Sequence, residues 1–139
     1  MEVEKNDSIL YEKTGKIPRT FCYPFNAVNS DILKITSKNR VGTRTEQYPI
    51  GGDKSKSTPE SLDKWVESLV NSGRWGVAMI HGISQGYDAF LNPEILWEHF
   101  SKVKALENKI WVGTFREVVA YNKRTRKKSL ECARKRKRL

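Results

Sequence analysis

Short apolar runs alternate along the chain with longer segments in which apolar residues recur at helical spacing. Residues 20–23 and 75–80 form the two strongest runs, and each predicts a buried strand. Residues 41–43 and 110–112 are shorter strand candidates. Helical segments separate the four runs, so the order predicts an α/β fold of parallel βα units. A closed (β/α) barrel needs about eight strands, so we expect part of a larger α/β architecture.

Caps and stop signals mark the first helices. Residues 2–14 have helical composition, and Gly15 is placed to end the helix. Ser30 or Asp31 is expected to cap a short helix that follows the first strand. Residues 44–56 are predicted to form a polar loop that contains a Gly-Gly-Asp sequence.

The second half of the chain carries stronger helix signals. Residues 57–60 supply a cap, an early proline and a capping-box Glu. An apolar stripe follows at i, i+3, i+4, i+7 and i+8, and Gly73 closes this helix. Another helix is predicted over residues 93–107. Thr114 and Glu117 form a further capping box, which begins a helix that runs into the carboxyl-terminal tail.

Positive charge is concentrated at one end of the chain. The 139 residues carry a formal net charge of +10, and residues 123–139 hold ten Lys and Arg against one acid, a net +9. Residues 1–122 therefore carry a net charge of only +1. This nearly neutral charge excludes a nucleic-acid-binding domain that spans residues 1–122. We divide the chain into an α/β domain over 1–122 and a basic tail over 123–139.

Targeting signals and cysteines place few limits on the compartment. No apolar run approaches the roughly 18–20 residues that span a bilayer, so no membrane span is expected. The first five residues include two acids and no apolar segment of a signal peptide, so the chain stays where it is made or lacks its natural amino end. Cys22 and Cys132 lie far apart, a disulfide between them is not favoured, and Cys22 is expected to be a small core residue.

Three strand-end motifs occur in a recognisable order. They are Thr20-Phe21-Cys22-Tyr23-Pro24-Phe25-Asn26, then Met79-Ile80-His81-Gly82-Ile83, then Ile110-Trp111-Val112-Gly113-Thr114-Phe115. Residues 2–122 thereby resemble the carboxyl half of polysaccharide deacetylases, the NodB-homology proteins of carbohydrate esterase family four. The resemblance implies a distorted, incomplete (β/α) barrel. It also implies hydrolysis of acetyl groups on N- or O-acetylated polysaccharide.

The resemblance assigns roles to two residues in particular. His81 matches the family's catalytic histidine, an imidazole that can protonate the leaving amine. Phe25 matches the aromatic residue whose backbone N–H faces the tetrahedral oxyanion. By the same match Tyr23, Pro24 and Asn26 line the substrate groove. Two positions depart from the family: Cys22 stands where many members have an orienting Arg, and Asn26 stands where they have Gly.

The resemblance also implies a divalent metal, usually zinc, held by one Asp and two His, with a second Asp as general base. The chain has only two histidines, His81 and His99, and no His-x₃-His motif or Asp-Asp pair. A catalytic zinc ion needs three protein ligands and an open position. We therefore expect no cofactor in this chain and little or no activity of the chain alone. Family members are often secreted, and the compartment of this chain stays open.

Two other functions remain open on the sequence. A half-barrel exposes unpaired strand edges, so the domain could instead bind carbohydrate, a second copy or the missing barrel half without catalysis. The basic tail could contact nucleic acid, an anionic glycan or acidic lipid, although a solvated helix end is the simpler interpretation. No aromatic residue follows Tyr121, so base stacking by the tail is unsupported.

Other candidate residues have simpler structural interpretations. Trp75, Trp97 and Trp111 could stack on sugars, but a Trp at a strand start or on a helix is more often core. Arg44 could reach a substrate oxygen, and a solvated loop charge is preferred. His99 lies inside a predicted helix and is expected to be structural.

Overall fold

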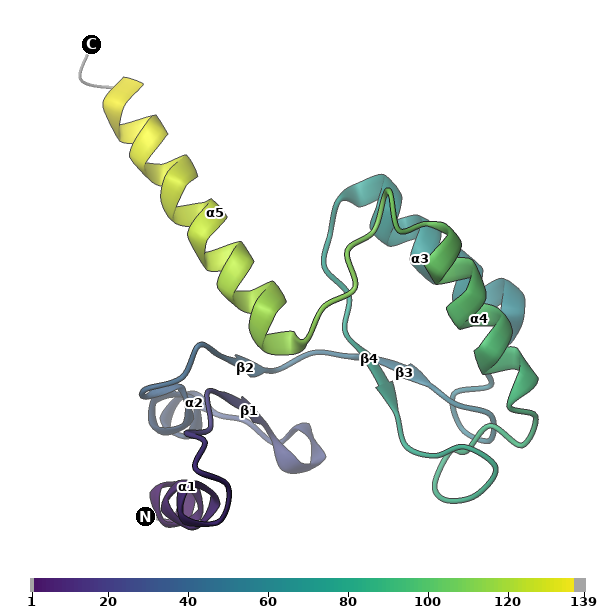
Figure 1. Cartoon of the computed structure of the whole chain (residues 1–139), viewed down its shortest axis with the longest axis horizontal. Coiled ribbons are helices and arrows are strands. Elements are labelled where there is room, and N and C mark those ends of the chain that lie inside the picture. The colour runs from purple at the N-terminus through teal and green to yellow at the C-terminus, as the bar shows by residue number, and fades with distance from the viewer. Residues whose placement is uncertain (1, 137–139) are drawn as a thin grey trace. The chain divides into compact units, whose positions relative to one another are not determined.

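The computed structural model describes residues 2–136, with side chains described to residue 130. The chain forms two compact units. The first unit comprises Met1–Thr45 and Gly113–Leu139, and the second unit is the continuous segment Glu46–Val112. The expected α/β class with parallel strands is confirmed, because each unit contains a two-stranded parallel sheet (Figure 1). None of the described helices is long and apolar enough to cross a membrane.

The first unit is built on strands β1 and β2. In chain order its elements are α1 (Glu2–Thr14), β1 (Thr20–Cys22), the 3-10 turn η1 (Pro24–Asn26), α2 (Ser30–Ser37), β2 (Gly42–Arg44) and α5 (Phe115–Arg136). The strands pair in parallel, with Thr20 opposite Gly42 and Cys22 opposite Arg44. Gly42 permits close packing of α5, because a Cβ added there would lie 2.8 Å from Val119 Cγ1. Val119 is accordingly buried.

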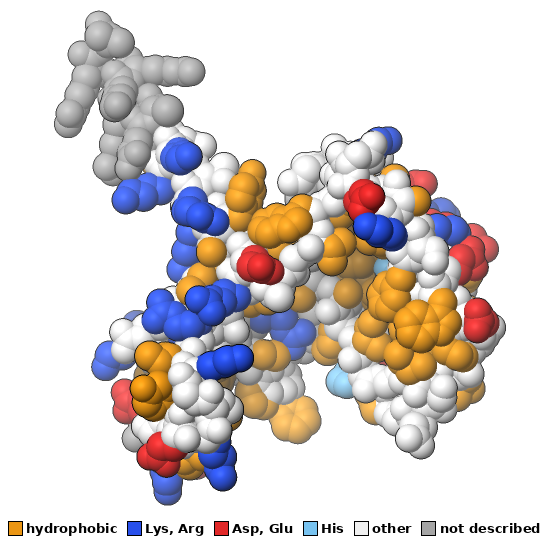
Figure 2. Space-filling model, in the orientation of Figure 1, with side chains coloured by type: hydrophobic (Ala, Val, Ile, Leu, Met, Phe, Trp, Pro, Cys, Tyr) orange, Lys and Arg blue, Asp and Glu red, His pale blue; other side chains and the backbone are white. Residues whose placement is uncertain are grey.

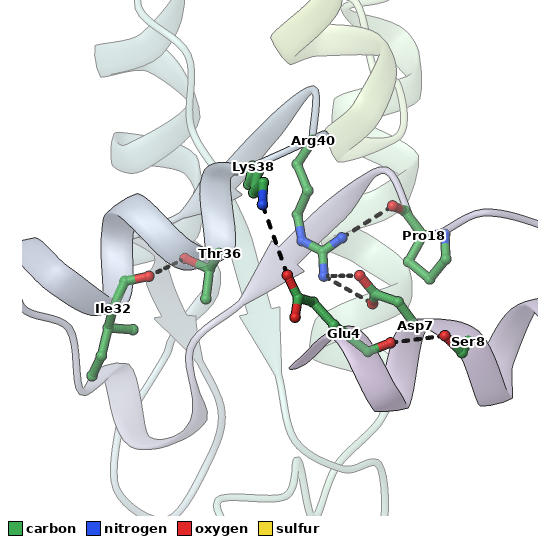
Figure 3. Close-up of polar contacts among 8 residues, drawn as sticks. All are labelled: Glu4, Asp7, Ser8, Pro18, Ile32, Thr36, Lys38 and Arg40. Atoms are coloured by element: carbon green, nitrogen blue, oxygen red, sulfur yellow. Dashed lines mark hydrogen bonds and ion pairs between the residues drawn. The ribbon is translucent and has the colours of Figure 1, made fainter. Parts of the chain in front are cut away.

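A buried guanidinium joins α1 to the sheet of the first unit. Arg40 donates two hydrogen bonds to the Asp7 carboxylate, at 2.9 and 2.8 Å, and one to the Pro18 carbonyl oxygen at 3.1 Å (Figure 3). Its side chain is only 3% exposed, and its guanidinium lies 5.3 Å from the centre of the Phe21 ring. Few large apolar side chains are buried in this unit, so this ion pair is a principal tie between α1 and β1. Losing one partner of a buried pair is strongly destabilising.

The second unit has the larger apolar core. Its elements are β3 (Tyr48–Ile50), α3 (Pro59–Ser72), β4 (Ala78–Ile80) and α4 (Glu94–Ala105). β3 and β4 pair in parallel, with Ile50 opposite Ile80. The core cluster consists of four fully buried side chains: Ile50, Leu62, Phe90 and Leu96. Tyr48 stacks on Trp65 at 4.6 Å beside this cluster. The two helices are also linked by an ion pair of 2.7 Å between Lys102 and Asp63.

Several strand predictions were wrong. Residues 44–56 are not wholly a loop, because Arg44 belongs to β2 and Tyr48–Ile50 forms β3. Residues 110–112 form no strand, and the Trp111 and Val112 side chains are exposed. The predicted strand over 75–80 is shortened to Ala78–Ile80. The four strands therefore pair two by two within the described residues, rather than in one continuous order.

Most helix predictions are confirmed, with corrections at two caps. The helix over 2–14 ends at Gly15, which has a φ of 66°. The cap of α2 is Asn29, whose side chain accepts hydrogen bonds from two amides of the first turn, and not Ser30 or Asp31. The capping box of α3 pairs Thr58 with Ser61, so the predicted Glu is not its partner. The capping box of Thr114 and Glu117 is confirmed.

The expected burial of several single residues was also wrong. Trp75, Trp97 and Trp111 were expected in the core, but their side chains are 41%, 51% and 55% exposed. Cys22 is exposed as well, because it ends β1 where the chain turns outward. Side chains from residue 131 onward lie outside the described residues, and this part includes Cys132 and half of the basic tail.

Candidate functional site

His81 lies at the carboxyl end of β4, immediately after Ile80. Its side chain is exposed. The loop that follows folds back on itself, because Phe90 N–H donates to the Gly82 carbonyl at 3.2 Å and Ser84 N–H donates to the Phe90 carbonyl at 2.8 Å. Phe90 is fully buried in the core of the second unit. His81 is therefore presented to solvent from a loop whose far end is fixed in the core.

An aromatic ring supports the imidazole. The His81 and Tyr87 rings meet edge to face, with centres 5.0 Å apart and planes at 86°. Tyr87 is itself 65% exposed, so the pair stands at the surface. Edge-to-face contacts of this kind add specific attraction to simple burial. The contact limits the directions in which His81 can point.

A buried carboxylate fastens the His81 loop to the loop that follows β3. Asp88 Oδ1 accepts hydrogen bonds from the amides of Lys54 and Ser55 at 2.6 and 3.0 Å, and Oδ2 accepts one from the Ser55 hydroxyl at 2.5 Å. We call this arrangement the carboxylate clamp. The Asp88 residue is 4% exposed and has a φ of 50°. Gly51 faces the clamp and has no room for a side chain, because an added Cβ would collide with Asp88.

The electrostatics of the clamp favour the ionised carboxylate. The hydrogen bond from the Ser55 hydroxyl lowers the pKa of Asp88 most, and burial opposes it. The amides of Ser55 and Lys54 lower the pKa further, and the charge of His81 does so as well. Asp88 is thus an anion at neutral pH that both joins the two loops and interacts with the charge of His81.

The second candidate cluster is the turn that follows β1. Phe25 and Asn26 both have left-handed backbone conformations, with φ of 53° and 56°. Asn26 N–H donates to the Tyr23 carbonyl at 3.1 Å and Ala27 N–H donates to the Pro24 carbonyl at 3.0 Å, which closes the turn. The Phe25 side chain is fully exposed. Among the residues described, none accepts a hydrogen bond from the Phe25 N–H.

Tyr23 anchors this turn. It is 2% exposed, and its hydroxyl lies 2.8 Å from the Thr36 hydroxyl. Because Thr36 donates its own proton to the Ile32 carbonyl, Tyr23 is the donor in this pair (Figure 3 shows the Thr36 bond). The aromatic ring of Tyr23 is thus placed under the turn, while Pro24, Phe25 and Asn26 are exposed above it.

Cys22 and Arg44 meet at the ends of β1 and β2. They are register partners, and the Arg44 guanidinium donates a hydrogen bond to Cys22 Sγ. Arg44 is half-buried and belongs to a strand, so it is not the solvated loop charge that was preferred. The structure therefore joins Arg44 to the end of β1, directly before the first-unit turn.

The two clusters belong to different units. Phe25, Tyr23, Pro24 and Asn26 lie in the first unit, and His81 lies in the second. Each cluster follows the carboxyl end of a parallel strand, where ligands bind in open α/β sheets. The residues predicted from sequence are thus gathered into two separate sites by the fold of each unit.

The described residues do not fit the metal ion of the deacetylase family. Within them, no group of three His, Cys, Asp or Glu side chains could hold a metal ion. His99 is buried at 6% exposure, as expected for a structural residue, and burial lowers its pKa. Its Nδ1 has no hydrogen-bond partner among the described residues.

Sequence reasoning missed the partners of His81. Tyr87 contacts His81 from within the same loop, whereas Asp88 and Ser55 make their contacts across 33 residues of chain. The one local signal was the pair Gly51-Gly52 directly before the polar loop, because adjacent glycines often mark a close approach of backbone.

No family model, no curated protein and no solved structure matches the chain.

Proposed function

We propose that this chain is a polysaccharide deacetylase-like protein and that it supplies the proton-donating and oxyanion-binding side of an acetyl-hydrolysing site. The observation that carries the proposal is the position of His81. It is an exposed imidazole at the carboxyl end of a parallel strand, on a loop held by the carboxylate clamp.

The chemistry that His81 contributes is proton donation. When the tetrahedral intermediate collapses, the carbon–nitrogen bond of the acetamide breaks and the departing nitrogen needs a proton. A protonated imidazole supplies that proton and becomes neutral imidazole.

Phe25 contributes its backbone rather than its ring. An N–H group that is held rigidly and aimed at developing negative charge stabilises an oxyanion. Phe25 and Asn26 have left-handed conformations, and no described residue accepts a hydrogen bond from the Phe25 N–H. Pro24 and Asn26 flank this amide at the surface and would contact the sugar, with Tyr23 supporting the turn from below.

The proposal implies that the chain alone hydrolyses little or no substrate. The described residues lack a metal-binding group of three His, Cys, Asp or Glu side chains. They retain groups for binding the acetylated sugar and for proton transfer. Binding of an acetylated sugar without turnover is therefore the expected behaviour of the purified chain.

The test is a nuclear magnetic resonance titration of the whole chain with N-acetylated chitotetraose. The matched control ligand is the fully deacetylated tetramer. We expect the acetylated sugar to shift signals of residues 23–26 and 81–83, and the control to shift them far less. Shifts confined to other residues, or equal shifts with both sugars, would refute the proposal. Stoichiometric zinc binding with acetate release would refute the expectation that the chain alone hydrolyses little or no substrate.

A non-catalytic binding module is the alternative. The observation in its favour is that each described strand pairs with only one neighbour, which leaves main-chain groups at the outer edges. Such edges pair readily with another chain. Sedimentation separates this alternative from the first proposal: association that depends on concentration supports it, and a monomer at high concentration contradicts it.

A further inference from the structure

Helix α5 carries a dense positive surface that the proposed function does not use. Within its described side chains, five of the six residues from 123 to 128 are Lys or Arg, and the segment contains no acid. All five are exposed. No ion pair joins any of them to another described residue. They are Lys123, Arg124, Arg126, Lys127 and Lys128.

The first turns of α5 pack against the rest of the first unit, and the basic segment continues the same helix. Val119 is buried and packs against Gly42 of β2, and the capping box of Thr114 and Glu117 begins the helix. The helix then runs without interruption to Arg136. In Figure 1 its far half extends away from the other elements of the first unit, and in Figure 2 Lys and Arg side chains gather along it.

The charges cover slightly more than half of the helix circumference rather than forming one narrow stripe. At 3.6 residues per turn, the five side chains cover an arc of about 200° around the axis. No apolar face lies opposite them, because the only large apolar residue described beyond Tyr121 is Leu130. A helix that lies on a lipid surface needs such an apolar face. Binding of single strands by base stacking needs aromatic residues, which are also missing here.

A partner with negative charge on two sides fits this distribution. The major groove of B-form DNA, about 12 Å wide, admits an α-helix between two phosphate backbones. The stretch from 123 to 136 is about 20 Å long, and duplex DNA presents about one phosphate per 1.7 Å of axis. By sequence this stretch carries eight Lys and Arg and one Glu.

We propose that the basic segment of α5 is a binding surface for duplex nucleic acid, held by phosphate contacts from Lys and Arg and without base-specific recognition. Binding by phosphate contacts releases counterions, so affinity falls with salt at a slope of about −0.9 for each contact. For five contacts, raising salt from 50 to 200 mM should weaken binding about 500-fold. This inference is independent of the proposed deacetylase chemistry.

The test measures the fluorescence anisotropy of a labelled 20-base-pair DNA duplex mixed with the whole chain, at salt concentrations from 50 to 200 mM. One variant replaces the five basic residues of 123–128 by Gln, which preserves helix propensity. The matched control replaces five exposed lysines elsewhere by Gln: Lys5, Lys13, Lys16, Lys64 and Lys109. Both variants lose the same net charge.

We expect the chain to bind the duplex and the α5 variant to lose affinity with a shallower salt slope. The control variant should keep most of its affinity. Deletion of residues 123–139 should cause at least the same loss as the α5 variant. Equal losses in the two Gln variants would reduce the effect to net charge and overturn the proposal. Absence of duplex binding at 50 mM salt, or tighter binding to anionic vesicles or sulfated polysaccharide, would overturn it too.

Discussion

The carboxylate clamp should govern the stability of the loop that presents His81. Replacing Asp88 by Ala removes three hydrogen bonds to a charged acceptor and leaves the Lys54 amide, the Ser55 amide and the Ser55 hydroxyl without that partner. Hydrogen bonds to charged groups contribute about 1.5–3 kcal/mol each in favourable cases. Part of this is recovered because water reaches the exposed side of the loop. We expect a net loss of about 3 kcal/mol, which is about 100-fold in the opening equilibrium.

Asp88→Asn provides a graded comparison. The amide oxygen can still accept from the two backbone amides, and the Ser55 hydroxyl can rotate to accept from the new NH₂ group. The expected cost is therefore about 1 kcal/mol. Asp53→Asn is the matched control, because Asp53 is exposed and close in sequence but lies outside the clamp.

The stabilisation that the Asp88 carboxylate contributes should depend on pH. The pKa of Asp88 is lowered in the folded chain, so its stabilisation is fully present above the pKa of an unfolded Asp, about 3.9, and is lost as pH falls through the folded value. The Asp88→Asn variant should therefore lack this loss of stability at acidic pH, whereas the Asp53→Asn variant should retain it. The assay is amide hydrogen exchange at Lys54 and Ser55 with urea unfolding at neutral and acidic pH. Unchanged exchange in Asp88→Ala would refute the reasoning.

Three further predictions concern other contacts. Arg40→Met should destabilise the first unit by about 3 kcal/mol in urea unfolding because it breaks a buried ion pair, whereas Lys38→Met, at an exposed pair, should stay within about 0.5 kcal/mol. Gly51→Ala should lose about 1–3 kcal/mol by collision with the clamp, visible as faster amide exchange around the polar loop. Burial lowers the pKa of His99, so stability should fall as pH drops below about 6.5, and His99→Phe should lack that fall in thermal melts. A flat profile with His99 present would contradict this.

Helices were predictable because their signals are local. The caps at Thr114 and the stop at Gly15 act within one helical turn, and the structure contains both. The error at α2 has the same local origin: Asn29 lies one residue before the predicted cap, and its side chain reaches the first-turn amides better than Ser30 could. Such errors displace a boundary without changing the fold.

Strands were less predictable because pairing depends on distant residues. β3 contains Pro49, which cannot donate to a ladder and argues against a strand in sequence. It forms because Tyr48 and Ile50 pack beside Trp65 and in the core, while β4 supplies the pairing edge. Residues 110–112 are more apolar, yet no described strand pairs with them. Apolarity alone therefore does not make a strand.

Only part of the candidate site could be predicted from the sequence. His81 and Phe25 stand at strand ends, and strand ends follow from apolar runs. The carboxylate clamp depends on hydrogen bonds between residues more than 30 positions apart, and no local sequence pattern predicts them. Single-sequence reasoning therefore locates exposed reactive groups more readily than the groups that hold them.

The central claim is that the Phe25 amide and the His81 side chain both contact N-acetylated sugar. The most direct measurement is paramagnetic relaxation by a spin-labelled, N-acetylated chitotetraose, read at the Phe25 amide and the His81 ring in one titration. We predict broadening of both signals at the same ligand concentration, with reversal by unlabelled acetylated sugar. Broadening of only one of the two, or of neither, would contradict the claim that both residues contact acetylated sugar.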